Sequence, residues 1–287
     1  MTNEDSPRNE IERSAADREE TALVEKAREG DGSAIGELIG PLQSPLFAYI
    51  YRMVAHRQDA EDIMQDVLIK MMESLPRFRG ESKFKTWLFG IATHVCLDRL
   101  KEKKRWRIEA QLIGEQEADQ TPGAIEQLRS TMAKPDFVFE IREHIAFCFS
   151  CIGRSLPPEE QAAIMLKEVF GFTSVEAAGM IGVSEPVFRH RLSSARASMV
   201  SAYEGLCQLI NKTGRCYQCR GLREVAPESH RGPDLVRIEV APGKVVSPDA
   251  LLDERIEIAR NAALGTGPMR EMHDSFFSKV GGREDNV

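Results

Sequence analysis

Residues 173–192 read TSVEAAGMIGVSEPVFRHRL and carry the signals of two short helices joined by a tight turn. Thr173 or Ser174 can cap the first helix, because a side-chain oxygen there satisfies backbone N–H groups that lack a partner within the helix. Gly182 suits the turn, and Ser184 followed by Pro186 suits the start of the second helix. The pattern predicts a helix-turn-helix, with an ordinary helical hairpin as the alternative.

The second helix of this motif is expected to have an apolar inner side and a cationic outer side. Val187 and Leu192 are expected to point back to the core. The outer side carries Arg189, His190, Arg191 and Arg196. Such a helix can enter the major groove of DNA, with its first residues on bases and its arginines on phosphates. The alternative is a solvated basic face.

Helical periodicity extends well beyond this motif and organises the chain into parts. Residues 1–18 are polar and acidic and are expected to form a disordered arm. Within 19–107 we expect four helices: two separated by the glycines at 30–32, one over 59–75 and one over 84–106. Residues 108–135 lose this periodicity and are expected to be a linker.

A second helical unit is expected over 136–206, with helices over 137–152, 158–169, 174–181 and 186–209. Residues 207–287 form an extension of mixed character, with a short strand expected at 235–240 and an isolated amphipathic helix at 248–264. The predicted fold class is all-α, with two small helical domains joined by a linker and followed by a mixed C-terminal extension.

Charge is distributed unevenly along the chain. The formal net charge is −7, but residues 77–107 contain ten Lys or Arg against three Asp or Glu, so that this segment is +7 and the remainder is −14. A basic segment in an acidic chain indicates one surface for an anionic partner.

The termini and cysteines bear on the compartment. The N-terminal segment is polar, and no run of eighteen or more apolar residues occurs in the sequence. We therefore expect a soluble cytoplasmic protein without a membrane partner. In that compartment the six cysteines are expected to be reduced thiols or metal ligands.

Two further stretches carry a family resemblance. Residues 59–70 read DAEDIMQDVLIK and residues 78–100 read FRGESKFKTWLFGIATHVCLDRL, and together they resemble region 2 of the sigma-70 superfamily. Residues 155–196 resemble region 4. The order of the regions, the short linker and the lack of a region 3 between them resemble the extracytoplasmic-function type of sigma factor. The resemblance covers residues from about 20 to 205.

The resemblance implies roles for individual residues. Three residues would dock on the β′ clamp helices of core RNA polymerase: Asp62, Gln65 and Asp66. The loop over 78–83 would hold a base flipped from the −10 element. The residues expected at the −10 element are Arg77, Phe78, Arg79, Lys83, Lys85, His94, Arg99, Lys103, Lys104 and Arg105. Those expected at the −35 element are Ser184, Val187, Phe188, Arg189, His190, Arg191 and Arg196.

The implied partners are core RNA polymerase, through its β′ clamp helices and β flap, promoter DNA, and an anti-sigma factor. The sequence departs from the family pattern at three places. His94 stands where an asparagine is frequent, and Phe188 and His190 replace smaller or hydroxyl residues. Trp87 is expected to be a core residue rather than a stacking platform for a base.

The cysteines suggest a second kind of site. Two CxxC pairs, Cys148 with Cys151 and Cys216 with Cys219, can supply four thiolates to a tetrahedral zinc ion. His144 and Cys207 are alternate ligands. The segment from His144 to Cys151 resembles the metal motif of zinc-bound anti-sigma proteins. A redox-active thiol pair and simple packing of cysteines in a core remain alternatives.

Cys96 is assigned to packing in the first helical unit. Because the cysteine-bearing extension continues past the helix-turn-helix, we expect it to be a metal-sensing or redox-sensing regulatory part. No nucleophile–base pair, phosphate-binding loop or credible pair of carboxylates is recognisable in the sequence, so we do not expect an enzyme.

The leading prediction is a sigma factor that directs transcription initiation by promoter recognition and −10 melting. The alternative is a stand-alone helix-turn-helix regulator with a zinc or thiol sensor. The polymerase-binding pattern over 59–70 distinguishes the two, because a stand-alone regulator does not need it.

Overall fold

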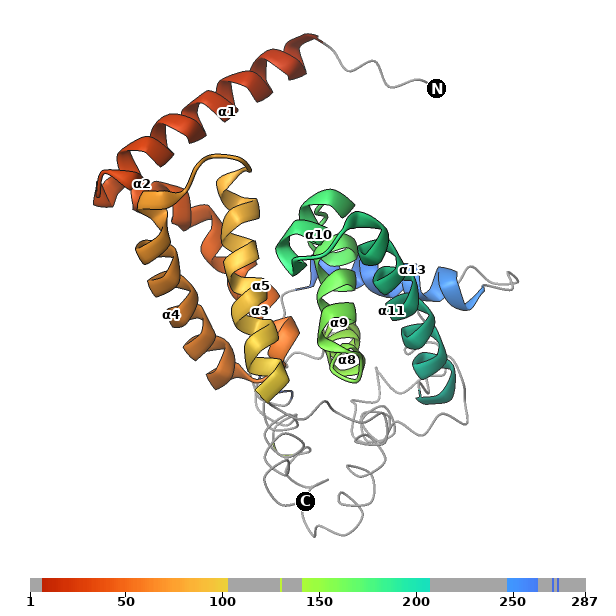
Figure 1. Cartoon of the computed structure of the whole chain (residues 1–287). Helices are drawn as coiled ribbons and strands as arrows, with labels where there is room; N and C mark the ends of the chain where they lie inside the picture. Colours follow the sequence, from red (N-terminus) through yellow and green to blue (C-terminus); the bar gives the residue numbers. More distant parts are fainter. Residues whose placement is uncertain are drawn as a thin grey trace.

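The computed structural model describes residues 7–102, 130, 141–206, 247–262, 270 and 273, and every element within them is helical (Figure 1). The first unit contains α1 (Pro7–Arg28), α2 (Gly32–Ile39), η1 (Gly40–Leu42), α3 (Gln43–Val54), α4 (Arg57–Ser74), η2 (Leu75–Arg77) and α5 (Phe84–Glu102). The second unit contains α8 (Ile141–Gly153), α9 (Pro158–Ile164), the π-helical turn η3 (Met165–Val169), α10 (Ser174–Ile181) and α11 (Glu185–Leu206). One helix of the extension, α13 (Pro248–Asn261), is also described. The all-α prediction is confirmed, and the strand predicted at 235–240 lies outside the described residues.

Local side-chain chemistry sets the helix boundaries of the first unit. Asp31 caps α2, because its Oδ1 accepts hydrogen bonds from the backbone N–H groups of Ser33 at 2.8 Å and Ala34 at 3.2 Å. The apolar pattern over 35–53 predicts a single helix, but the structure divides it at η1. Pro41 lies in η1 and has no N–H to donate, so the α-helical hydrogen-bond ladder does not continue through it.

The prediction of a disordered arm over 1–18 is wrong for residues 7–18, which are helical in α1, while residues 1–6 lie outside the described residues. The acidic composition was misleading, because residues 8–18 contain no glycine or proline and consist mostly of residues compatible with a helix. Farther along α1, Val24 and Ala27 are buried in the core. Glu20 accepts a hydrogen bond at 2.9 Å from the backbone N–H of Phe84 at the start of α5. These contacts anchor the C-terminal half of α1.

The helix-turn-helix predicted over 173–192 is confirmed as α10, a turn and α11. Thr173 and Glu176 form a reciprocal capping box, in which each side chain accepts a hydrogen bond from the backbone N–H of the other. Gly182 ends α10 with a φ of 76°. In that left-handed conformation an L side chain is strained, which explains the glycine at the turn.

Replacing Gly182 with alanine is expected to lower the free energy of unfolding by about 1–2 kcal/mol, because the alanine Cβ crowds the following carbonyl oxygen in the left-handed conformation. Gly179→Ala is the matched control: a Cβ at either glycine meets nothing within 4 Å, but Gly179 lies inside α10. The Gly179 variant should gain about 0.5–1 kcal/mol. Urea unfolding of both variants measures the difference, and equal effects would contradict the assigned turn geometry.

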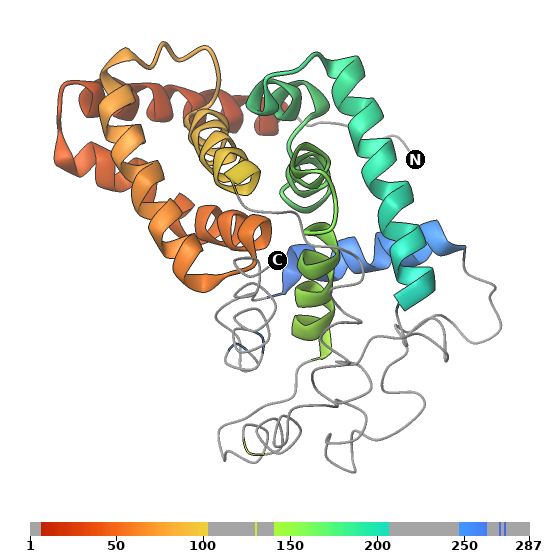
Figure 2. The same ribbon diagram turned by 60° about the horizontal axis from the view of Figure 1, so that its bottom comes forward.

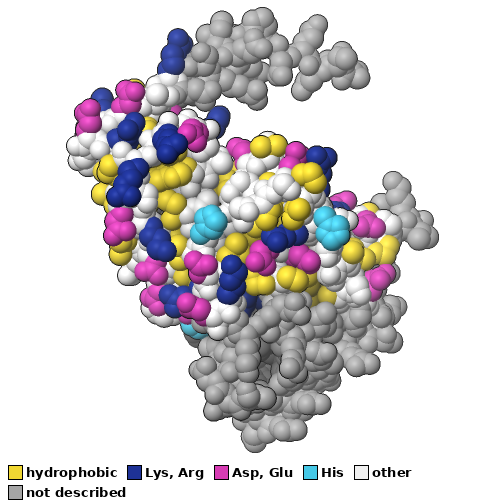
Figure 3. Space-filling model, in the orientation of Figure 1, with side chains coloured by type: hydrophobic (Ala, Val, Ile, Leu, Met, Phe, Trp, Pro, Cys, Tyr) yellow, Lys and Arg dark blue, Asp and Glu magenta, His cyan; other side chains and the backbone are white. Residues whose placement is uncertain are grey.

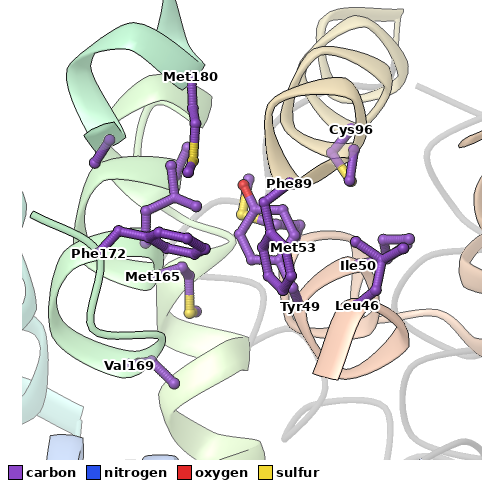
Figure 4. Close-up of a cluster of buried hydrophobic side chains, with 14 of the residues drawn as sticks. Leu46, Tyr49, Ile50, Met53, Phe89, Cys96, Met165, Val169, Phe172 and Met180 are labelled. Atoms are coloured by element: carbon purple, nitrogen blue, oxygen red, sulfur yellow. The ribbon is translucent and has the colours of Figure 1, made fainter. Parts of the chain in front are cut away.

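The two units share one hydrophobic core, although the sequence predicts two domains with only a linker between them. Figure 4 shows side chains of α3 and α5 facing side chains of η3 and α10. The ring of Tyr49 meets the ring of Phe170 edge-on at 5.4 Å, and the rings of Phe89 and Phe172 are 5.0 Å apart. Gln161 Nε2 donates to the backbone oxygen of Met53 at 3.0 Å. The units are therefore packed together as one body.

Helix α13 is predicted over 248–264 as an isolated helix, and its existence is confirmed but its isolation is wrong. Ser247 caps it by accepting a hydrogen bond from the N–H of Ala250 at 3.2 Å. Leu252, Ile256 and Ala259 are buried in the common core. Figure 2 shows α13 crossing the second unit beside α8 and α11, with one end toward the first unit.

None of the helices in the described part of the chain is both long enough and apolar enough to cross a bilayer.

Candidate functional site

The second helix of the helix-turn-helix motif, α11, presents a different set of side chains from the predicted one. Phe188 has no exposed surface, whereas the side chain of Val187 is 45% exposed. Phe188 belongs to a buried stripe with Ala195 and Met199, spaced seven and four residues apart as one face of a helix requires. Phe188 is therefore a core residue and not a base contact, and Val187 does not point back to the core.

The outward face at the start of α11 consists of Ser184, Val187, Arg189 and His190, which are all exposed. Arg191 is half-buried. Arg189 forms an ion pair with Glu185 at 3.1 Å one turn earlier, which holds its guanidinium along the helix surface. An exposed methyl-bearing side chain beside cationic and imidazole groups is suited to the mixed polar and apolar edge of the major groove.

Arg196 lies farther along α11 and is already engaged within the chain. Its guanidinium is 2.6 Å from Asp253 of α13 and 3.5 Å from Glu168 of η3. Burial opposes the charged form, but the hydrogen bond and the charges of these carboxylates outweigh it and raise the pKa of Arg196. The phosphate contact predicted for Arg196 is not available while α13 is docked.

The loop over 78–83 was predicted to hold a flipped base, with Phe78 among its contacts. Phe78 is instead buried, stacked on Trp87 with 4.6 Å between ring centroids and edge-on to Phe84 at 6.2 Å. The assignment of Phe78 to the −10 contact set is therefore wrong for this structure. Trp87, expected in the core, is half-buried and packs against it. Arg79 and Lys83 are exposed in the same loop, as is Arg77 before it.

The basic residues on α5 do not form one open patch. The ammonium of Lys85 lies 4.9 Å from the ring centroid of Phe172, which belongs to the second unit. Arg99 faces Asp66 of α4 at 3.7 Å, and His94 is exposed. Lys103, Lys104 and Arg105 lie outside the described residues. On the face drawn in Figure 3, cationic and acidic side chains alternate across the surface.

One face of α4 is turned outward and has no packing role. Asp62 and Gln65 are exposed, as predicted for a binding surface. Sequence reasoning missed that Ile69 and Met72 continue this stripe at helical spacing, with 57% and 49% of their surfaces exposed. We call Asp62, Gln65, Ile69 and Met72 the α4 outer face. The sequence does contain a signal for this apolar part of the face, because Ile69 and Met72 follow Gln65 by four and seven positions.

The opposite face of α4 packs in the core through Ile63, Val67 and Met71, which are fully buried. Asp66 is partly buried and turned toward Arg99, so its carboxylate is shared with α5 rather than presented alone. An exposed stripe with carboxylate and amide groups at one end and apolar groups at the other is suited to a protein partner.

The predicted metal ligands are only partly placed by the structure. Cys148 and Cys151 lie on α8, half-buried and buried respectively, one and two helical turns after the buried His144. Burial lowers the pKa of His144 to about 4, so its imidazole is neutral at pH 7. His273 of the extension stacks on Phe147 at 3.9 Å between ring centroids. Cys207, Cys216 and Cys219 lie outside the described residues.

Within the described ranges, no group of three or more His, Cys, Asp or Glu side chains has a metal-binding arrangement. A four-thiolate site would need Cys216 and Cys219 in addition to the pair on α8. Cys96 is fully buried in the first unit, and burial raises the pKa of its thiol, in agreement with its predicted packing role.

In its described residues the protein is thus all-helical, with a helix-turn-helix in one unit and a helix with an exposed polar and apolar face in the other. Family models bear on both units: sigma-70 region 2 matches residues 38–106, and sigma-70 region 4 matches residues 148–199. The chain therefore contains segments that match sigma-70 regions 2 and 4, in that order. Helix α13 lies outside both matched segments.

Several curated proteins are similar to this chain. The ECF RNA polymerase sigma factor SigG of Mycobacterium tuberculosis is 27% identical over 237 residues, which cover 79% of this chain and 59% of SigG. The RNA polymerase sigma-H factor of Pseudomonas aeruginosa is 27% identical over 188 residues, covering 64% of this chain and 93% of that protein. The ECF RNA polymerase sigma-E factor of Escherichia coli K12 is 28% identical over 178 residues, covering 62% of this chain and 90% of that protein.

Two solved structures are similar at a lower level. The structure of CnrH in complex with the cytosolic domain of CnrY matches with a TM-score of 0.46 and 18% identity, covering 64% of this chain and 97% of that chain. The sigma factor RpoE in complex with the anti-sigma factor NepR from Bartonella quintana matches with a TM-score of 0.41 and 19% identity, covering 59% and 96% respectively.

Proposed function

We propose that this chain is a promoter-specificity subunit that binds core RNA polymerase, recognises −10 and −35 elements and helps to melt the −10 region. The observation that carries the proposal is the presence of both sigma-70 regions in one chain, each with exposed side chains suited to a partner. The bond-making step belongs to the polymerase in this proposal, and the chain supplies recognition in the cytoplasm.

The α4 outer face is the proposed contact with the polymerase clamp helices. Asp62 and Gln65 offer acceptors to a basic partner helix, and Ile69 and Met72 offer apolar area that loses water on docking. Asp66 can join this contact only from its position beside Arg99. A helix that already buries its other face needs no rearrangement to dock, which keeps the entropic cost of binding low.

The start of α11 is the proposed contact with the −35 element, through Ser184, Val187, Arg189 and His190. The exposed loop residues Arg79 and Lys83 are proposed contacts with the −10 strand. Phosphate contacts supply most of the affinity for DNA, and base-edge contacts supply the specificity. The β flap and an anti-sigma factor are further proposed partners without an assigned surface here.

Binding to core polymerase tests the proposal against a stand-alone regulator. The purified chain should migrate with core polymerase on a native gel and should be displaced by an excess of another sigma factor. A chain that binds DNA fragments alone and never shifts core polymerase would favour the stand-alone regulator. Ile256→Asp, which places a carboxylate in the buried face of α13, should be assayed beside the natural chain.

We further propose that the extension contains a cysteine-based zinc site that joins α8 to the segment after α11. The placement of His144, Cys148 and Cys151 one turn apart on α8 supports this, and Cys216 with Cys219 would complete the ligand set. A redox-active thiol pair is the alternative.

Reduced protein purified without chelator is expected to contain about one zinc ion per chain, because four thiolates close a tetrahedral site. Cys148→Ser and Cys216→Ser should each lose most of it, and Cys96→Ala should retain it, since Cys96 lies in the first-unit core. Mass-spectrometric metal analysis reads out all three variants. Reduced natural protein free of metal would refute the zinc site, and reversible oxidation of the thiols would then favour the redox alternative.

A further inference from the structure

Helix α13 contacts both units at once. Its apolar face, Leu252, Ile256 and Ala259, is buried in the core that runs through both units, and its closest neighbour along its length is α8. Figures 1 and 2 both place it alongside the second unit, with its C-terminal end directed toward α3. Because α13 lies outside both sigma-70 matches, neither unit requires it as part of its family fold.

The contact with the first unit is made by a buried cation. Arg52 of α3 is 3% exposed, and its guanidinium donates to the backbone oxygen of Ala259 at 2.6 Å and to that of Ala262 at 3.4 Å. These carbonyls end α13, where they lack helical donors and form the negative end of the helix dipole. Burial lowers the pKa of Arg52 to about 10, so the group remains charged at pH 7.

Every hydrogen bond that the Arg52 side chain makes within the described residues goes to a backbone carbonyl. The end of α13 therefore compensates much of this buried charge, and a first unit without α13 would have to expose Arg52 to water. Docking of α13 and burial of Arg52 are coupled for this reason.

The contact with the second unit involves the predicted DNA-binding helix. Asp253 of α13 is 2.6 Å from Arg196 of α11. The guanidinium of Arg255 lies 4.1 Å from the ring centroid of Tyr203, also on α11. Arg260 donates to the backbone oxygen of Glu168 at 2.5 Å. The same short helix is thus joined to α3, η3 and α11.

The arrangement that α13 joins is closed. Thr86 of α5 donates to Glu176 of α10 at 3.0 Å, and Lys85 of α5 lies over Phe172, so α5 faces the helix-turn-helix. Burial alone would raise the pKa of Glu176, but hydrogen bonds from Thr173 and Thr86 and the charge of Lys83 lower it, so this contact is made by a carboxylate.

On a promoter, elements roughly 25 base pairs apart are separated by about 85 Å at 3.4 Å per base pair. Two units packed face to face cannot reach both.

We propose that α13 is an internal strap: by docking on α3 of the first unit and on α8 and α11 of the second, it holds the two regions in a closed state that cannot span a promoter, and its release permits promoter binding. This inference rests on the proposed sigma-factor function. The segment that covers these parts of α3, α8 and α11, and so regulates promoter binding, belongs to the same chain.

The strap is tested by Ile256→Asp in the full-length chain. Ile256 is 2% exposed, and a carboxylate in that apolar contact disfavours docking. The variant should have a larger radius of gyration in small-angle X-ray scattering. With core polymerase it should give about tenfold more promoter-dependent transcript than the natural chain, the factor that about 1.4 kcal/mol of lost docking free energy produces.

A charge-matched pair separates the strap from a general charge effect. Asp253→Lys repels Arg196 and should raise transcription about two- to fivefold, the range for losing a partly exposed ion pair. Glu254→Lys makes the same charge change at an exposed neighbour on α13 and should behave as the natural chain does.

The outcomes distinguish the two proposals. Equal scattering and equal transcription for Ile256→Asp and the natural chain would overturn the strap, even if both are active with core polymerase. Expansion of Ile256→Asp without transcription from either chain would support the strap as a structural device and overturn the sigma-factor function. Identical behaviour of the Asp253 and Glu254 variants would overturn the assigned contact with Arg196.

Discussion

Replacing Phe188 with alanine is expected to lower the free energy of unfolding by about 3–5 kcal/mol, the usual cost of truncating a fully buried phenylalanine. Phe188 has no exposed surface and packs in line with Ala195 and Met199. The cavity would lie between α11 and the rest of the second unit, so the helix-turn-helix should lose its fixed geometry. Urea unfolding followed by circular dichroism measures the change.

Val187→Ala is the matched control for Phe188→Ala. The side chain of Val187 is 45% exposed, so its truncation should change stability by less than about 0.5 kcal/mol. It should instead weaken binding to the −35 element, because Val187 lies on the outward face of α11. If Val187→Ala were the more destabilising variant, the register assigned to α11 would be incorrect.

Combining Asp62→Lys with Ile69→Lys is expected to weaken binding to core polymerase by about 100-fold. One change reverses a charge that faces a basic partner, and the other places a cation in apolar contact area, which together can remove about 2.8 kcal/mol. Both side chains are exposed, so the melting temperature of the free chain should change little. Fluorescence anisotropy with labelled chain measures the binding.

Glu254→Lys is the control for this experiment as well, since it adds positive charge on α13 rather than on the α4 outer face. It should bind core polymerase as the natural chain does. Undiminished binding of the double variant, with a normal melting temperature, would exclude the α4 outer face as the polymerase contact.

Local signals were sufficient to predict much of the helix-turn-helix. The hydroxyl at Thr173 and the glycine at 182 each act within a few residues of their own position, so the predicted bounds of α10 agree with the structure. The same holds for α4, where the buried face formed by Ile63, Val67 and Met71 follows helical spacing.

The wrong sequence predictions concern residues whose burial depends on tertiary contacts. Val187 and Phe188 are neighbours of similar apolar character, and only the packing of the second unit determines which one is buried. Phe78 looks like a loop residue available for stacking, but Trp87 and Phe84 come to it from the next helix. The docking of α13 on Arg52 joins residues more than 200 positions apart, and no local pattern can indicate such a contact.

The extension is where this chain differs most from the segments matched by the family models. Its helix α13 docks along α8, and α8 also carries Cys148 and Cys151. The proposed zinc site and the proposed strap therefore share one helix of region 4. Region 4 is thereby joined to the extension through both α8 and α11, the proposed DNA-binding helix.

Mapping of transcription starts on pooled genomic fragments, with core polymerase alone and with added chain, tests the central claim most directly. The natural chain and Ile256→Asp should both be used, so that a closed strap does not hide activity. We predict starts that occur only with added chain and that share upstream −10 and −35 elements. The same starts with and without either chain, together with DNA binding by the free chain, would contradict the sigma-factor function.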